Sequence, residues 1–375
     1  MSRGLSRRGF VRAAGITALT ARAGLLQAKV HQGVESPVPS VRPNRFAFVG
    51  VMGAVHAYAT DGEMWRLRQI VTSEAPISLA LHPSGRSLYA LNEVSSYRGL
   101  PCGSVEAYKV DSETGQLNLL GREGLSLSAT MPRHLAMAPD GKSVVVAVHG
   151  GGAYNLLPIL ADGCLARVSS ILKETGCGPV AEHQKAAHPQ TILFDTTGKR
   201  MIAADLGCDK VSVLSMEDGL EVLARHDMPA GSGPRHLALH PAGHLLYVAH
   251  ALDGSLAGFA YDADAGKIMH QVGLTRGECG DALAMHPSGD FLYTAGGGLL
   301  TAWRIEPATV ALRGIHSREI RGDIHGMMVR SDGRRLLALT SRGILEIGVD
   351  TGSGRLAEPA LAVPVSGVRS IALLS

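Results

Sequence analysis

Two arginine–histidine pairs begin two nearly identical stretches of this sequence. Arg133-His134 begins RHLAMAPDGKSVVVAV, and Arg235-His236 begins RHLALHPAGHLLYVAH. An arginine guanidinium offers fixed positive charge and several donors to a carboxylate, a phosphate or a developing oxyanion. A histidine can exchange a proton near neutral pH. The two pairs therefore favour chemistry on a small anionic molecule, provided that the fold brings them together.

The elements that must position these pairs are repeated hairpins. Each repeat is an apolar strand, a turn that ends in glycine and a second apolar strand, which is the pattern of a β-hairpin. A third strand and a short fourth strand follow, as in GSVEAYKVD and then QLNLL. Four strands in each period are typical of a propeller blade. The units recur every 44 to 57 residues, with turn glycines Gly85, Gly141, Gly198, Gly243, Gly289 and Gly333.

A seventh unit is divided between the two ends of the chain. The C-terminal GVRSIALLS matches only the first strand of the repeat, and RFAFVGVMGAVHAYATDGEMWRL from Arg45 matches the other three. We therefore predict an all-β fold, a single seven-bladed β-propeller over residues 45–375 with four antiparallel strands per blade. Pairing of Val368–Leu373 with Phe46–Gly50 would close the ring and remove its open edge.

The first strand of every blade lines the central channel of a propeller, so equivalent positions form rings around it. The ring eight residues before the turn glycines is Ile77, Arg133, Gln190, Arg235, Asp281, His325 and Arg369. The next ring is Ser78, His134, Thr191, His236, Ala282, Gly326 and Ser370. The first ring predicts a cationic funnel that binds a carboxylate or phosphate. The alternative is that these polar residues cap strand ends and hydrate the channel.

Two further groups of polar residues follow from the same register. Glu93 and Asp205 stand at the far ends of second strands, which we expect on the face opposite to the funnel unless a loop returns them. They are either loop-borne acids of the site or solvated, turn-capping carboxylates. The histidines of the L-H-P turns, His82, His240 and His286, are expected to be structural.

Composition excludes one class of function and leaves the redox state open. The chain has 36 Lys+Arg and 33 Asp+Glu, for a net charge of +3, and carries no long run of like charge, so nucleic-acid binding is not expected. No C-x-x-C spacing is present, which argues against a zinc ribbon or a thioredoxin-type site. One or two disulfides in an oxidising compartment and five free thiols are equally consistent with Cys102, Cys164, Cys177, Cys208 and Cys279.

The N-terminus is typical of an export signal. SRRGFVR from Ser6 is a twin-arginine pattern, followed by a short apolar run and an A-x-A site at 21–23. We predict a twin-arginine signal over residues 1–28, a linker over 29–44 and a periplasmic or secreted protein, with a cytoplasmic location as the alternative. The apolar run is too short to span a bilayer, so no membrane insertion is expected after signal removal.

Three segments of the chain resemble the seven-bladed β-propeller lactonase family, which includes 6-phosphogluconolactonases and carboxymuconate lactonising enzymes. They are LALHPSGRSLYALNEV, AHPQTILFDTTGKRMIAADLGCDKVSV and GSGPRHLALHPAGHLLYVAH, starting at Leu79, Ala187 and Gly231. The resemblance implies hydrolysis or formation of lactones of acidic small molecules, with no metal and no cofactor. Arg235, His236, Glu93 and Asp205 match the pattern of that family.

The chain also departs from that pattern at several positions. The family usually reads R-Q-E-x-x-H-x-H before the third hairpin, where this chain has HQKAAHPQ, so His183, Lys185 and Gln190 differ. Ala251 stands where the family has a glutamate, and Gly297 where it has an arginine. These changes leave standard 6-phosphogluconolactonase chemistry open.

Opening a lactone requires a base that activates water and positive charge that stabilises the oxyanion. We predict His188 as the base and Arg235 as the second catalytic residue, which with Arg133 stabilises negative charge or binds the anionic group of the substrate. The main hypothesis is a lactonase that acts on an anionic sugar or carboxylic-acid lactone. The alternative is a non-catalytic exported propeller that binds an anionic small molecule or a partner protein, and in both cases we expect a monomer. The predicted substrate-binding residues are Arg133, His134, Gln190, His236, Asp281, His325 and Arg369.

Overall fold

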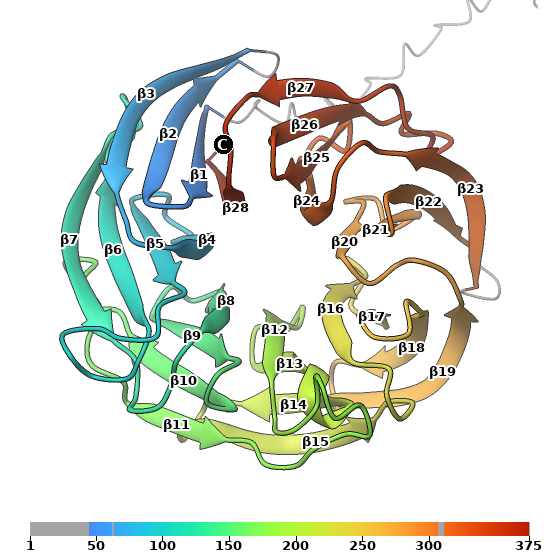
Figure 1. Ribbon diagram of the computed structural model, residues 1–375, viewed down its shortest axis with the longest axis horizontal. Coiled ribbons are helices and arrows are strands. Elements are labelled where there is room, and N and C mark those ends of the chain that lie inside the picture. The colour runs from blue at the N-terminus through green and yellow to red at the C-terminus, as the bar shows by residue number, and fades with distance from the viewer. Residues whose placement is uncertain (1–44, 62–63, 307–310, 375) are drawn as a thin grey trace, which may run out of the picture. The chain divides into compact units, whose positions relative to one another are not determined.

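The computed structural model describes residues 45–61, 64–306 and 311–374. In these ranges the chain forms seven four-stranded antiparallel sheets around a central axis, which confirms the predicted seven-bladed β-propeller (Figure 1). The predicted signal over 1–28 and linker over 29–44 lie outside the described residues.

Six blades are continuous in sequence. The first three contain β4 (Pro76–Leu81), β5 (Ser87–Asn92), β6 (Ser104–Val110) and β7 (Leu117–Gly124); β8 (Pro132–Met137), β9 (Ser143–Val148), β10 (Ala153–Pro158) and β11 (Ser170–Lys173); and β12 (Pro189–Phe194), β13 (Arg200–Asp205), β14 (Lys210–Ser215) and β15 (Glu221–Asp227). The next three contain β16 (Pro234–Leu239), β17 (Leu245–His250), β18 (Leu256–Asp262) and β19 (Lys267–Thr275); β20 (Ala282–Met285), β21 (Phe291–Gly296), β22 (Leu299–Ile305) and β23 (Leu312–Glu319); and β24 (Ile324–Val329), β25 (Arg335–Thr340), β26 (Gly343–Gly348) and β27 (Ala360–Val363).

The seventh blade joins the two ends of the chain, in the order β28 (Val368–Leu374), β1 (Phe46–Val51), β2 (Ala54–Thr60) and β3 (Trp65–Thr72). β28 and β1 are antiparallel, with Leu374 opposite Phe46 and Ser370 opposite Gly50. The predicted closure is therefore confirmed, and every first strand has a hydrogen-bonded neighbour in its sheet.

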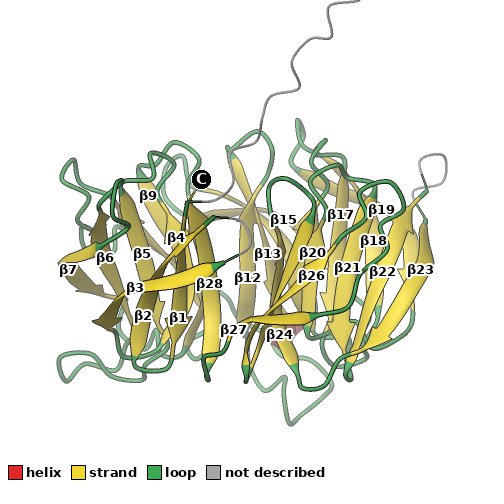
Figure 2. Ribbon diagram, turned by 90° about the horizontal axis from the view of Figure 1, so that it is seen from above, coloured by secondary structure: helices red, strands yellow, loops and turns green. Residues whose placement is uncertain are grey.

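Burial follows the position of a strand in its blade. All six residues are buried in β5, β9, β17 and β21, because these second strands lie between sheets on both sides. Such strands are continuously apolar rather than alternating. The outer strand β15 alternates exposed and half-buried residues instead. Figure 2 shows the strands running between two faces on which the loops lie.

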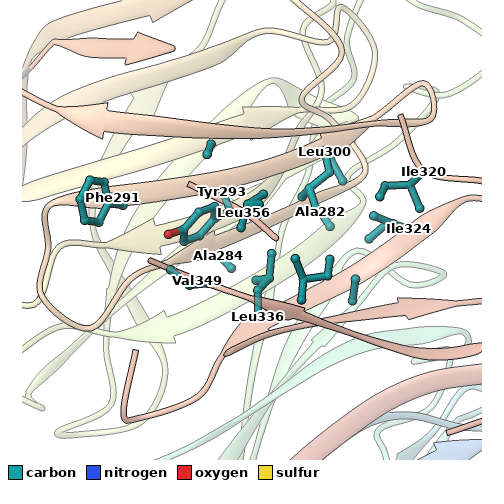
Figure 3. Close-up of a cluster of buried hydrophobic side chains, with 14 residues drawn as sticks. Ala282, Ala284, Phe291, Tyr293, Leu300, Ile320, Ile324, Leu336, Val349 and Leu356 are labelled. Atoms are coloured by element: carbon teal, nitrogen blue, oxygen red, sulfur yellow. The ribbon is translucent and has the colours of Figure 1, made fainter. Parts of the chain in front are cut away.

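Apolar side chains from neighbouring sheets fill the space between blades. One such cluster joins β20–β23 to β24–β27 and includes Phe291, Tyr293, Leu300 and Leu336, each at most 1% exposed (Figure 3). Its members come from two sheets that could not cover these faces alone. Stacking around the ring is therefore what buries the core.

The L-H-P histidines are structural, as predicted. His82 Nε2 lies 3.0 Å from the carbonyl oxygen of Gly141, and His286 Nε2 lies 3.0 Å from that of Gly333, each in the turn of the next blade. Both glycines have φ near +72°, and a Cβ atom on either would lie within 2.6 Å of the imidazole. Each histidine thus holds the turn of its neighbour, where only glycine fits.

All five cysteines are free thiols in this structure. The one described helix is a single 3₁₀ turn, Leu206–Cys208. Among the described residues, no helix has the length and hydrophobicity needed to cross a membrane.

Candidate functional site

A cavity of about 650 Å³ lies on the propeller axis, lined by side chains from the first strands of all seven blades. We call it the funnel cavity. Seven of the nine predicted site residues line it: Arg133, His134, Gln190, Arg235, His236, His325 and Arg369. The other two, His188 and Asp281, do not.

Glu93 lies at this site, which is one of the two alternatives that the sequence left open for it. Its carboxylate forms ion pairs with both Arg133 and Arg369. The reason is the hairpin itself: β4 and β5 are antiparallel, so Asn92 at the end of β5 lies opposite Pro76 at the start of β4. The expectation that second strands end on the face opposite to the funnel was wrong. We call the face on which first strands begin and second strands end the funnel face.

Arg235 differs from the other two arginines because it forms no ion pair with any carboxylate in the described part of the chain. Burial lowers the pKa of its guanidinium, the charge of Asp281 on the neighbouring blade opposes that shift, and the charge of Arg133 adds to it. A half-buried cation without an ion-pair partner pays part of a desolvation cost that an incoming anion can offset. Arg235 is therefore the free positive charge of the funnel cavity.

The loop before Arg235 is held by Asp209, a residue that the sequence interpretation did not single out. The Asp209 carboxylate accepts hydrogen bonds from the backbone N–H groups of Gly231 and Gly233, at 2.7 and 2.8 Å. It also accepts one from Gln184 Nε2 at 2.7 Å. Asp209 has φ of +51°, a left-handed conformation that aspartate tolerates better than most residues. It thereby joins the loop before β16 to the loop that carries His188.

His188 stacks on His149 beside the funnel cavity. Their ring centroids are 4.1 Å apart, and the ring planes differ by 13°. His188 Nδ1 lies 3.0 Å from the carbonyl oxygen of His149, which can only accept, so the Nδ1 atom carries the proton and Nε2 keeps a lone pair. Gln190 links the pair to the cavity, since its Nε2 donates to His149 Nδ1 at 2.7 Å and to the His188 carbonyl oxygen at 3.1 Å.

His149 occupies the same position after its second strand as Glu93 does in the preceding blade. Burial lowers the pKa of His149 to about 4, and the nearby charges of His188 and Arg133 add to the effect. This imidazole is therefore neutral at neutral pH. The hairpin register could have found it, because Val148 pairs with Pro132 next to Arg133.

Asp205 positions the backbone of His188. Its Oδ1 accepts hydrogen bonds from the N–H groups of His188 at 2.8 Å and Gly207 at 2.9 Å. Its Oδ2 is buried without a partner among the described residues. Burial raises the pKa of Asp205 to about 6, against the lowering effect of these hydrogen bonds. Asp205 is thus a capping carboxylate on the funnel face, close in space to the candidate base but outside the cavity lining.

His134 and His236 lie one residue deeper than the arginines. Burial lowers the pKa of His134 to about 4 and that of His236 to about 3, with the charge of Arg235 adding to the second shift. His134 Nδ1 lies 3.5 Å from the backbone nitrogen of Ile192 in the next blade. His236 Nε2 is buried with no partner in the described residues. Both imidazoles are neutral at neutral pH, so neither adds charge to the cavity.

Two departures from the family pattern lie next to the same loop. The loop between β19 and β20 lies across the ends of β17 and β21 on the funnel face. A Cβ atom on Gly280 would lie 2.9 Å from the Cα atom of Ala251, and one on Gly297 would lie 1.4 Å from Glu278 Oε2. A side chain at Gly297 would have to displace the Glu278 carboxylate and adopt a φ of +53°. Of the other changed positions, His183 and Lys185 are exposed, and Gln190 bridges the histidine pair.

No group of three or more His, Cys, Asp or Glu side chains in the described ranges is arranged to hold a metal ion. The site offers one guanidinium without an ion-pair partner and, close by, a histidine whose Nδ1 atom is already hydrogen-bonded.

Comparison with known proteins gives one matching family model, described as "Lactonase, 7-bladed beta-propeller", over residues 52–371. The 6-phosphogluconolactonase of Bacillus subtilis (strain 168) is 28% identical over 231 residues, which are 60% of this chain and 64% of that protein. The chain therefore spans just under two thirds of that relative.

Solved structures show the same fold. A putative 6-phosphogluconolactonase from Bacteroides fragilis superposes with a TM-score of 0.80 at 21% identity, covering 90% of this chain and 100% of that one. A periplasmic gluconolactonase from Pseudomonas aeruginosa superposes with a TM-score of 0.79 at 24% identity, covering 88% and 99%.

Proposed function

The chain belongs to the lactonase family of seven-bladed β-propellers, and we propose that it hydrolyses the lactone of an anionic sugar or carboxylic acid at the funnel cavity. The observation that carries this proposal is Arg235, a half-buried guanidinium on the cavity wall without a carboxylate ion-pair partner in the described chain. Such a group attracts an anion and stabilises an oxyanion far better than it could in water. The curated relative from Bacillus subtilis carries the name 6-phosphogluconolactonase, which supports the reaction class.

In the proposed reaction, His188 Nε2 accepts a proton from a water molecule as the water oxygen attacks the lactone carbonyl carbon. Arg235 stabilises the negative charge that develops on the carbonyl oxygen. When the ring C–O bond breaks, His188 returns the proton to the departing alkoxide, so the products are a carboxylic acid group and a hydroxyl group on one molecule. Asp205 and Gln190 are positioning residues, because they hold the backbone of His188.

The test measures the hydrolysis of a panel of sugar and muconate lactones by the purified protein. The acid that is released reports the rate. His188→Gln should lower turnover by about 10²- to 10⁴-fold, the usual contribution of a general base. His183→Gln is the matched control, because His183 is exposed on the same loop and touches neither Asp205 nor Gln190. Absence of turnover on every lactone would refute the proposal, as would equal effects of the two substitutions.

A second candidate function is non-catalytic binding of an anionic small molecule or a partner protein. Ala251 and Gly297 favour it, because the funnel face lacks an acid and a cation at these two positions. The same panel separates the two functions: a binding protein would hold the hydroxy-acid product without turning over its lactone. The wild-type protein alone suffices for this comparison.

We also propose that residues 1–28 direct export by the twin-arginine route and that the mature protein is a monomer. The paired guanidinium groups of Arg7 and Arg8 are the part of the signal that the export receptor reads. Replacing both with lysine should leave the full-length precursor in the cytoplasm, whereas unchanged processing would refute the export proposal. Sedimentation of the mature protein at the mass of a dimer would refute the monomer.

A further inference from the structure

The funnel cavity changes character along its depth. The positions two residues after the cationic ring contribute Leu79, Leu237, Leu283, Met327 and Ile371 to its wall. At a rise of about 3.3 Å per residue, this level lies about 7 Å further along the strands than the arginines. We call these five residues the apolar floor. The cavity therefore has a charged mouth and an apolar interior.

Polar groups between the two levels are directed at neighbouring blades. Ser370 Oγ donates to the carbonyl oxygen of Pro76 at 3.0 Å, and Ser78 Oγ accepts from the backbone N–H of Leu135 at 3.2 Å. These bonds connect adjacent first strands around the channel. The hydroxyl groups therefore have partners already and add little polarity for a ligand.

Most of the polar side chains at the mouth are also paired. Arg133 and Arg369 share Glu93, and His325 Nε2 lies 2.5 Å from the carbonyl oxygen of Val368. Arg235 is left for a ligand, because it forms no ion pair with a carboxylate of the described residues. The Arg235 guanidinium can form a bidentate pair with a single carboxylate group. Sugar hydroxyls placed against the apolar floor would lose their hydrogen bonds to water without replacement.

We propose that the lactone taken by this site is amphipathic, with its carbonyl or carboxylate at Arg235 and an uncharged apolar substituent directed along the channel onto the apolar floor. This inference rests on the proposed function and names its substrate class. It separates this chain from an enzyme for phosphorylated sugar lactones. Leu79, Leu237 and Leu283 then determine specificity, while Arg235 supplies the charge.

The test measures binding by calorimetry, so that it does not depend on turnover. The probes are butanoate, hexanoate and 6-phosphogluconate with the full folded protein. Burial of each methylene group strengthens binding by about fourfold, so hexanoate should bind about 15-fold more tightly than butanoate. 6-Phosphogluconate should bind more weakly than hexanoate. Equal affinities for butanoate and hexanoate, or tighter binding of 6-phosphogluconate, would overturn the inference.

Variants locate the effect. Leu283→Asn should reduce the preference for hexanoate over butanoate to below about fivefold, because a polar amide group then contacts the alkyl chain of hexanoate. Leu119→Asn is the control, since Leu119 is 58% exposed on the outer strand β7. If Leu283→Asn fails to fold, as judged by its thermal transition, Met327→Gln replaces it at another point of the apolar floor. A preference unchanged in a folded variant would refute the apolar floor.

The two proposals can fail separately. Chain-length-dependent binding without turnover of any lactone would refute the proposed hydrolysis and leave the amphipathic ligand class intact. Turnover that is fastest on phosphorylated sugar lactones would support hydrolysis and refute the ligand class.

Discussion

Arg369 on the last strand donates a hydrogen bond to the carboxylate of Glu93, 276 residues earlier in the chain. The same carboxylate pairs with Arg133. Arg369 reaches Glu93 because β28 pairs with β1 and lies beside β4, so the contact that completes the funnel mouth depends on closure of the ring. One carboxylate thus holds two arginines and leaves Arg235 as the free cation.

Loss of the Glu93 charge should destabilise the fold and uncouple the two arginines. Glu93→Gln should cost about 1.5–3 kcal/mol in the free energy of unfolding, the scale of hydrogen bonds to a charged group. Arg369→Ala should then cost less in the Glu93→Gln background than in the wild type. Urea denaturation of the wild type, the two single variants and the double variant measures this coupling. Strictly additive effects would contradict the pairing of Arg369 with Glu93.

Removal of the free guanidinium should affect function without affecting the fold. Arg235→Ala should lower turnover by on the order of 10²-fold or more, comparable to removal of one preorganised oxyanion donor. If the protein only binds, the same change should weaken an anionic ligand by about 1.5–3 kcal/mol. Arg313→Ala is the control, because the Arg313 side chain is 68% exposed on β23. Equal effects of the two variants would contradict the assignment.

Stability should fall in mild acid because of buried neutral histidines. The pKa of His236 is about 3 in the fold and about 6.5 unfolded, so the unfolded state binds more protons between these values. Its stabilising contribution is therefore present above pH 6.5 and lost as the pH falls. His236→Gln should reduce the slope of unfolding free energy against pH by about 1.4 kcal/mol per unit near pH 5. An unchanged slope would show that His236 is already protonated in the fold.

Asp205 should change the pH dependence of the unfolding free energy in the direction opposite to His236. Burial raises the pKa of Asp205 to about 6 from the ordinary value of 3.8, so its stabilising contribution is present below pH 3.8 and lost as the pH rises through 6. Asp205→Asn should therefore steepen the acid-induced loss of stability near pH 5. A shallower dependence in that variant would contradict the raised pKa.

A methyl group in the turn before β25 should be costly. Gly333→Ala places a Cβ atom 2.6 Å from His286 Nε2 at a φ of +72°, so both overlap and backbone strain oppose it. We expect a loss of about 1–3 kcal/mol in unfolding free energy. Gly121→Ala is the control, since nothing lies within 4 Å of a Cβ atom there. Denaturation of Gly333→Ala that matches this control would refute the packing role of His286.

The sequence by itself determined the number of blades, the strand positions and the closure by the last strand. These depend on local periodicity, because each hairpin repeats the same alternation of apolar runs and turn glycines. The register also placed Arg133, Arg235 and Arg369 at equivalent points of first strands, and the structure puts all three on one cavity. The structural role of His82 and His286 followed from their place in the turns.

Only the tertiary structure decided which charges neutralise one another. Glu93 forms an ion pair with Arg369, which lies 276 residues later in the chain. No local sequence pattern predicts such a contact between different blades. The proximity of the loop between β19 and β20 to Ala251 and Gly297 also appeared only in the folded chain. His188 proved to lie beside the cavity rather than in it, stacked on His149. Strand periodicity specifies the backbone positions, whereas pairing, burial and the resulting pKa shifts depend on the distances between side chains of different blades.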